Sequence, residues 1–139
     1  MRRLGVLLAA AVVGSSLLIP AARGSIACSP FTRLVFKDPH GYADGIAIND
    51  GDTTTVGRKI MAQEYADIPG SGFLQTCWSV KYFNGPAGKP YIWKTQRIDW
   101  LKAGSNRNPE EWQQDTLPGR NVMQVHAGGL TASFTWYGA

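Results

Sequence analysis

The chain has 139 residues and a formal net charge of +4, from 14 Lys and Arg against 10 Asp and Glu. Arg2, Arg3 and Arg23 lie in an expected export signal, so the rest of the chain has 11 basic and 10 acidic residues and a net charge of +1. This weak charge balance, with no cluster of Lys and Arg, argues against a nucleic-acid-binding protein.

Residues 1–24 have the three parts of a secretory signal peptide. Met1–Arg3 is cationic, Leu4–Ile19 is largely apolar, and small residues follow Pro20. The apolar run is shorter than the roughly 20 residues that span a bilayer as a helix. We therefore expect residues 1–24 to be removed during export. Residues 25–139 are expected to form one domain without a membrane span, secreted or at the cell surface, through the periplasm in a Gram-negative cell.

The two cysteines, Cys28 and Cys77, favour a disulfide. An even number of cysteines in an exported chain is typical of a structural bridge. The alternative is lipidation of Cys28, because residues 25–28 partly match a bacterial lipoprotein box. Ser25 stands where that box has an aliphatic residue, and lipidation would leave Cys77 as a single thiol. A bridge closing this loop would contribute about 4 kcal/mol on the chain-entropy model.

Short strands separated by turn residues are expected along the secreted part. Runs of β-branched and aromatic residues predict strands at residues 32–37, 45–48, 53–65, 73–83, 90–95, 121–126 and 130–137. One short helix is expected at Pro109–Gln114, with Asn108 as its cap. This organisation predicts an all-β fold, a single-domain β-sandwich or small barrel.

Five tryptophans suggest a binding face. Trp78 and Trp136 are expected in the core. Flat rings beside charged and amide side chains suit a sugar or a protein hot spot. We expect such a surface to be formed by Trp93, Trp100, Trp112, Arg97 and Arg107.

Catalytic and metal-binding patterns are weak. His40 and His126 have the chemistry of a general acid and base, but no local motif positions them. The acidic residues between Asp38 and Asp52 do not follow the EF-hand spacing. We therefore expect no metal and no cofactor.

The last predicted strand has the clearest pattern. Apolar and hydroxyl side chains alternate from Leu130 to Tyr137, which is typical of a half-buried strand. This run, following Gly128-Gly129, is similar to the terminal strand that a periplasmic chaperone grips in chaperone–usher fimbrial subunits. Residues 25–28, the strand entered through Asp52–Gly57, and Cys77 resemble the first half of the same subunits.

The fimbrial resemblance implies an immunoglobulin-like β-sandwich with one disulfide. It also implies that the last strand takes part in assembly with a chaperone and other fimbrial subunits, through Leu130, Ala132, Phe134, Trp136 and Tyr137. Only three residues lie between the expected cut and Cys28. Because a shaft subunit donates an N-terminal extension to its neighbour, the resemblance implies a minor or tip subunit.

Three functions follow from these patterns. The first is an exported binding and adhesion protein, as a minor or tip fimbrial subunit, for a protein or glycan on a cell surface. The second is a stand-alone secreted protein-binding module or inhibitor. The third is a small secreted hydrolase or toxin that uses His40 or His126.

Overall fold

The computed structural model describes residues 27–38, 40–42 and 45–139, and this part of the chain is all β. The expected signal peptide and the first half of the lipoprotein-like segment lie outside these residues. The elements are β2 (Arg33–Phe36), β3 (Thr53–Thr54), β4 (Lys59–Asn84), β5 (Trp93–Asp115), β6 (Gly119–Ala127) and β7 (Leu130–Gly138). All of them belong to one sheet.

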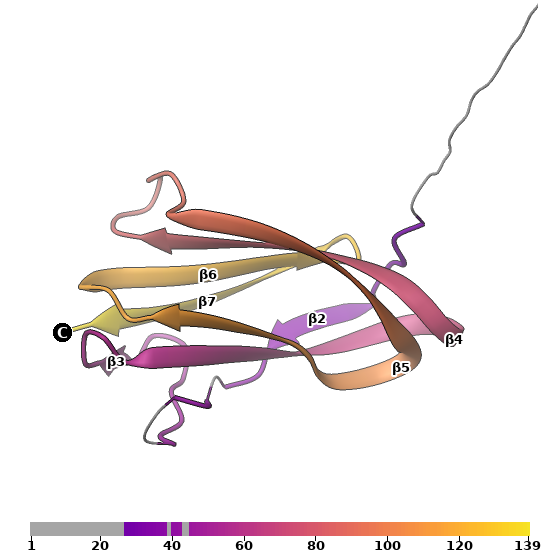
Figure 1. Cartoon of the computed structure of the whole chain (residues 1–139), viewed down its shortest axis with the longest axis horizontal. Helices are drawn as coiled ribbons and strands as arrows, with labels where there is room; N and C mark the ends of the chain where they lie inside the picture. Colours follow the sequence, from indigo (N-terminus) through magenta and orange to yellow (C-terminus); the bar gives the residue numbers. More distant parts are fainter. Residues whose placement is uncertain (1–26, 39, 43–44) are drawn as a thin grey trace, which may run out of the picture.

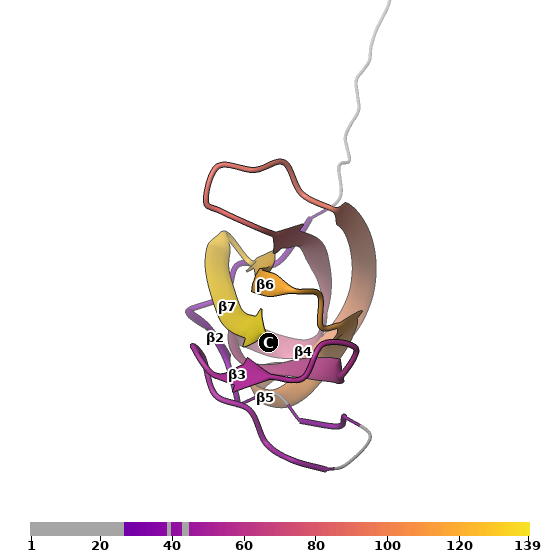
Figure 2. The same cartoon turned by 90° about the vertical axis from the view of Figure 1, so that its left-hand side faces the viewer.

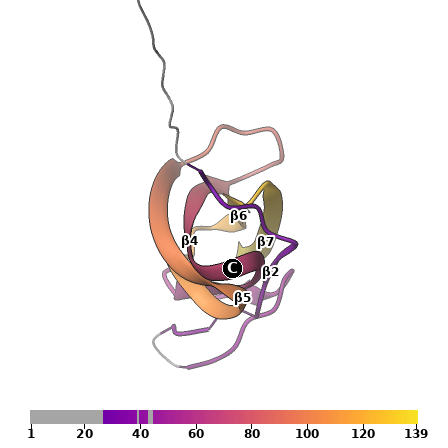
Figure 3. The ribbon, with the colours of Figure 1, turned by 90° about the vertical axis from the view of Figure 1, so that its right-hand side faces the viewer.

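A long hairpin of β4 and β5 forms the frame of the molecule (Figure 1). The two strands pair antiparallel from Lys59 with Asp115 to Tyr82 with Trp93. Their register shifts between Ile68 and Phe73, where Gly70 and Gly72 have φ angles of 123° and 70°. Bulges increase local twist and bend strands, so the hairpin curls instead of running flat. The result is a curled half-barrel, seen end-on in Figures 2 and 3.

The other strands extend the sheet from β4. The strand order is β2-β4-β6-β7-β3, with β5 on the other edge of β4. The first half of β4 pairs with β2, and its second half pairs with β6. β6 and β7 form a hairpin through Gly128 and Gly129, which have the positive φ angles that a tight two-residue turn needs. β3 pairs in parallel with the end of β7 at Tyr137 and Gly138.

Side chains that point into the curl form one core. Alternate residues of β4 are buried from Ile60 to Ile68 and again from Thr76 to Tyr82. Trp78 and Trp136 are almost fully buried, as the sequence predicts. The rings of Tyr82 and Phe134 pack against Trp136. The predicted last strand is confirmed as β7, with Ala132, Phe134 and Trp136 inward and Tyr137 outward.

The predicted disulfide between Cys28 and Cys77 is confirmed. It attaches the segment before β2 to the outer side of β4. The Phe31 ring packs on Trp78, and the Phe31 backbone N–H donates to the Gly128 carbonyl. A side chain at Gly128 would collide with the Phe31 ring, so this contact requires glycine.

The predicted helix at Pro109–Gln114 is wrong, because these residues belong to β5. Glu111 pairs with Gln63, and Trp112 pairs with Ala62. Pro109 lies where the β4–β5 register shifts, beside Asn108 with its positive φ of 56°. An irregular position tolerates a residue without an N–H. Pairing with β4 therefore overrides the local signals for a helix.

Four predicted strands also differ from the structure in their presence or bounds. Residues 45–48 form no strand, and the predicted strand 53–65 is divided into β3 and the start of β4 by a turn at Val56 and Gly57. The predicted strand 73–83 is the second half of β4, and residues 90–95 hold only the start of β5. The all-β class with one disulfide is confirmed.

Candidate functional site

The curled hairpin presents two outward surfaces. The second half of β4 and the first half of β5, with β6 and β7, form one of them, which we call the lysine face. Its outward side chains include Phe73, Gln75, Ser79, Lys81, Lys94, Gln96, Ile98, Trp100, Lys102, Arg120, Gln124, His126, Thr131 and Ser133. The first half of β4 and the second half of β5, with β2, form the other, which we call the ion-paired face. It carries Arg33, Val35, Lys37, Lys59, Met61, Gln63, Tyr65, Asp67, Ser105, Arg107, Glu111, Gln113 and Asp115.

Large apolar side chains are exposed on the lysine face. Phe73 is 69% exposed, Trp100 is 60% exposed and Ile98 is 54% exposed. Phe73 pairs across the hairpin with Lys102, and Ile98 pairs with Cys77. Because every second residue of a strand points to the same side, Ile98 and Trp100 are neighbours on this face. The three side chains form an apolar strip that runs toward the disulfide.

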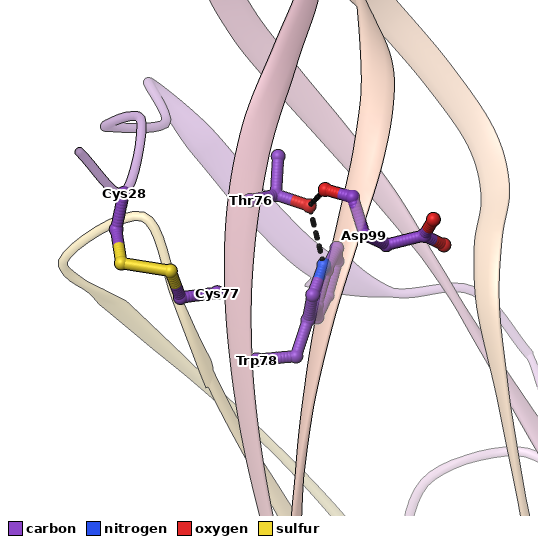
Figure 4. Close-up of a disulfide and its surroundings, with 5 residues drawn as sticks. All are labelled: Cys28, Thr76, Cys77, Trp78 and Asp99. Carbon is purple, nitrogen blue, oxygen red and sulfur yellow. Dashed lines mark hydrogen bonds between the residues drawn. A yellow bond between two sulfur atoms is a disulfide. The ribbon is translucent and has the colours of Figure 1, made fainter. Parts of the chain in front are cut away.

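A groove lies at one end of this strip. It has a volume of about 1020 Å³, and its lining includes Cys28, Cys77, Ser79, Ile98, His126 and Thr131. Figure 4 shows the disulfide on one side of β4 and the Trp78 ring on the other. The Trp78 indole N–H donates to the Thr76 hydroxyl, which donates to the Asp99 carbonyl. The floor of the groove is therefore a hydrogen-bonded sheet backed by the core.

Two lysines stand opposite each other on the lysine face. Lys81 on β4 pairs directly with Lys94 on β5. Both ammonium groups lie 5.9 Å from the centre of the Tyr91 ring, which is 46% exposed. Within the described part of the chain, neither lysine forms a salt bridge. Like charges placed directly opposite on neighbouring strands are unfavourable.

A cluster of carboxyl groups lies inside the curl, where the two halves of β5 meet. The Arg97 guanidinium donates to Glu110 at 2.5 Å and stacks over the Trp112 ring at 4.2 Å. Glu110 also faces the Asp99 carboxyl group. Glu64, on β4, is fully buried beside Glu110 and Trp112. The cluster therefore ties β4 to both halves of β5.

Burial changes the protonation of two of these groups. Desolvation raises the pKa of Glu64 to about 8, and the nearby Glu110 carboxyl adds to this effect. The Trp112 indole N–H and the Glu110 backbone partly oppose the shift, although neither Glu64 oxygen has a hydrogen bond of good geometry. Desolvation and the Asp99 carboxyl raise the pKa of Glu110 to about 7, against the lowering effect of Arg97. At neutral pH Glu64 is held protonated.

The carboxyl cluster is an internal structural element. Glu64 and Glu110 are 0% and 3% exposed, so a substrate in solution does not reach them in this conformation. Raised carboxyl pKa values often mark active sites, but buried structural groups show them too. The two histidines are not brought together either. His126 lines the groove, whereas His40 lies in a separate pocket with Phe36 and Tyr65.

The predicted binding residues do not gather on one surface. Trp100 is exposed on the lysine face, but Trp93 is half buried and stacks on Tyr82, while its indole N–H donates to Gln114. The expectation that Trp112 lies on the surface is wrong. Trp112 is 3% exposed, because β5 extends through it with its ring toward the core.

The two predicted arginines also lie apart. Arg97 covers the carboxyl cluster, with its side chain 45% exposed. Arg107 lies over the Tyr65 ring on the ion-paired face.

The residues that sequence reasoning missed are Phe73, Ile98 and the three lysines of the lysine face. An alternating pattern from Lys94 to Lys102 was the available signal. The intervening residues Thr95, Arg97 and Asp99 are polar, however. The segment therefore lacks the alternation of apolar and polar residues by which a half-buried strand is recognised.

No known family model and no curated protein sequence matches this chain. Within residues 27–38, 40–42 and 45–139, no helix is long and apolar enough to cross a bilayer. The same residues contain no group of three His, Cys, Asp or Glu side chains arranged to hold a metal ion.

Proposed function

We propose that this protein is an exported binding and adhesion domain that holds a cell-surface partner against its lysine face. The observation that carries the proposal is the apolar strip of Phe73, Ile98 and Trp100, three large side chains exposed on one regular sheet. Contiguous exposed apolar surface, unlike scattered single residues, marks interaction sites.

The strip is suited to binding because its support is rigid. The Cys28–Cys77 bridge and the buried Trp78 ring hold the same stretch of β4 from opposite sides. A preorganised surface loses little conformational freedom when a partner binds. Burial of apolar surface contributes about 25 cal/mol per Å², so an exposed Trp and Phe can supply much of a binding free energy.

Export is part of the proposal. A disulfide is typical of proteins that fold outside the reducing cytosol, and residues 1–24 have the sequence of a signal peptide. The domain would act after secretion or while held at the cell surface. We further propose that the half-barrel is a form of the immunoglobulin-like sandwich. The two halves of the β4–β5 hairpin, which enclose a common core, support this interpretation.

Assembly as a minor or tip fimbrial subunit is the second candidate. It is favoured by the incomplete pairing of β7, which β6 pairs along its whole length but β3 pairs only at Tyr137 and Gly138. β2 lies beside β7, but no strand pairing between them is seen in the described residues. The outer edge of residues 131–133 could therefore accept an added strand, such as one from a periplasmic chaperone. A purified domain that is monomeric and unfolds cooperatively without a partner would contradict this candidate.

Binding of the labelled domain to intact cells tests the main proposal. We expect fluorescently labelled protein to bind at least one of a panel of bacterial, plant and animal cells in flow cytometry. Trp100→Ala and Phe73→Ala should each reduce that binding about tenfold, because each removes an exposed aromatic contact. Tyr65→Ala is the matched control, since it removes an aromatic ring from the ion-paired face. The proposal fails if no cell type is bound, or if Trp100→Ala and Phe73→Ala bind cells as well as Tyr65→Ala does.

A further inference from the structure

We infer that the partner of the lysine face is an anionic polysaccharide, one that carries sulfate or carboxylate groups. This inference rests on the proposed function, because it names the partner of the same face. The lysine face has three outward lysines, Lys81, Lys94 and Lys102, and no outward Asp or Glu. A fourth outward cation, Arg120, lies at the start of β6 and donates to the Gly85 carbonyl. Its electrostatic complement is a negatively charged surface.

The Lys81–Lys94 pair is the centre of the anion-binding site. Two ammonium groups on directly paired residues repel each other in the free protein. The Tyr91 ring, 5.9 Å from each of them, offsets part of this repulsion by cation–π attraction. An anionic group bound between the two ammonium groups would neutralise both and turn the repulsion into two charge-assisted contacts.

Three cations elsewhere in the described part of the chain are paired with acids. Arg33 lies 3.9 Å from Asp67, Lys59 lies 3.5 Å from Asp115, and Arg97 contacts Glu110. None of these pairs lies among the outward side chains of the lysine face. Lys81, Lys94 and Lys102 form no salt bridge in the described part of the chain, so their charges are available to an external anion.

Polar side chains extend the site across four strands. Lys94 and Lys81 continue as Gln124 and Ser133 in one row of paired residues. The adjacent row is Gln96, Ser79, His126 and Thr131, and it borders the groove. Four strands are roughly 14 Å across, at about 4.8 Å between neighbours. A row of amide and hydroxyl groups of this length suits an extended ligand with many hydroxyl groups.

These observations favour a polysaccharide over other polyanions. Nucleic acid is bound by larger clusters of Lys and Arg than the three lysines and one arginine of this face. An acidic peptide would use the lysines but has fewer partners for the hydroxyl and amide rows. The exposed Trp100 and Tyr91 rings at the borders of the face provide flat surfaces for the apolar sides of sugar rings.

Heparin oligosaccharides, as the sulfated probe, and polygalacturonate, as the carboxylate probe, test the inference in calorimetric titrations. We expect the wild-type protein to bind at least one of them, and uncharged dextran not to bind. The double variant Lys81→Gln/Lys94→Gln should weaken binding about tenfold, because each exposed charge contact that is lost reduces the affinity about threefold. The control is Lys37→Gln/Lys59→Gln, which removes the same charge from the ion-paired face and should bind like wild type.

Lys94→Glu separates binding from folding. The new carboxylate would lie opposite Lys81 and form a cross-strand ion pair, so the thermal midpoint should rise while polyanion binding is lost. Loss of binding together with a lower midpoint would contradict the inference, because the lysines would then be needed only for folding.

The remaining outcomes are also decisive. Equal weakening by both double variants would show non-specific attraction and overturn the inference. Tighter binding of poly-glutamate than of either polysaccharide would identify an acidic protein partner instead. If cells are bound through Trp100 but neither polysaccharide competes, the inference fails while the proposed function stands. If no cell is bound but a polysaccharide binds through Lys81 and Lys94, the adhesion proposal fails and the site remains.

Discussion

The two outward faces of the sheet come from the same two strands, β4 and β5, but their charges are arranged differently. The ion-paired face carries four cations and three acids, and its arginines and lysines lie against carboxylates or the Tyr65 ring. The lysine face carries three lysines and Arg120, no acid and an exposed apolar strip. On one face the cations have acidic or aromatic neighbours within the chain, whereas the other leaves three lysines without an ion pair and an apolar strip exposed.

The difference begins at the bend between Ile68 and Phe73. Before the bend, the strands bring β2 and its charged side chains next to β4. After it, they bring β6 and β7, whose outward residues are amides, hydroxyls and His126. The comparison implies that substitutions on the lysine face should affect binding, whereas stability should depend on the interior between the faces.

The largest expected effect contrasts two tryptophans on β5, one from each half. Trp112→Ala should lower the free energy of unfolding by about 3–5 kcal/mol, because it removes a buried ring and the surface on which Arg97 stacks. Trp100→Ala should change it by less than about 0.5 kcal/mol, since that ring is exposed. Urea denaturation of both variants provides the measurement. Equal losses would mean that the lysine face is part of the folded core.

Removing the disulfide should have the next largest effect. Cys28→Ser/Cys77→Ser should lower the free energy of unfolding by up to about 4 kcal/mol on the chain-entropy model. The loss should also release the segment that borders the groove, so binding to the lysine face should weaken even at temperatures where the variant is folded. Denaturation of the variant and of the reduced wild type, followed by the titrations above, distinguishes the two effects. Unchanged binding would place the partner away from the groove.

The interior between the faces should make stability depend on pH. The pKa of Glu64 is raised to about 8, so the folded state holds a proton that the unfolded state releases near pH 4.5. The stabilisation is complete below that pH and is lost as the pH rises through about 8. The pKa of Glu110 is raised to about 7, so this group also stabilises the folded protein at low pH and less as the pH rises. The Asp99 carboxyl adds to the rise in the Glu110 pKa, and the Arg97 guanidinium reduces it.

Glu64→Gln should therefore raise the free energy of unfolding by about 2 kcal/mol at pH 8.5 and change it little at pH 4.5. Thermal unfolding of both proteins across this range is the measurement. The outward Glu111→Gln is the matched control and should leave the pH profile unchanged. A profile with maximum stability at pH 8 would show that Glu64 is ionised in the folded protein.

The smallest expected effect is on the lysine face itself. Lys102→Gln should leave stability within about 0.5 kcal/mol of wild type, because this exposed lysine has no ion pair in the described part of the chain. It should weaken polysaccharide binding less than the Lys81→Gln/Lys94→Gln change, since Lys102 has no second lysine opposite it. The binding constant of each variant, measured at several salt concentrations, gives the size of this loss. A loss as large as that of the double variant would mean that Lys81 and Lys94 are not the centre of the anion-binding site.

The local patterns of the sequence predicted much of the fold. The alternation from Leu130 to Tyr137 and the cysteine pair each depend on short-range or pairwise information, and both are confirmed. The length of β4 and β5 could not be predicted, because Pro69–Gly72 and Pro109 are local signals for a break. Pairing between distant residues carries the strands through these positions.

The candidate site was predicted only in part. Trp100 is exposed as expected, but Trp112, also expected on the surface, is buried. The Lys81–Lys94 pair depends on the register of the hairpin across its loop, which neither segment specifies alone.

The fold of β5 back onto itself has a consequence for solubility. β5 is an edge strand of 23 residues, paired only with β4. Long exposed edges recruit strands from other molecules and lead to aggregation. Here Trp93 reaches Gln114, and Arg97 reaches Glu110, across the two halves of the same edge. These contacts hold the two halves of the long edge close to each other, which should limit its pairing with strands of other molecules.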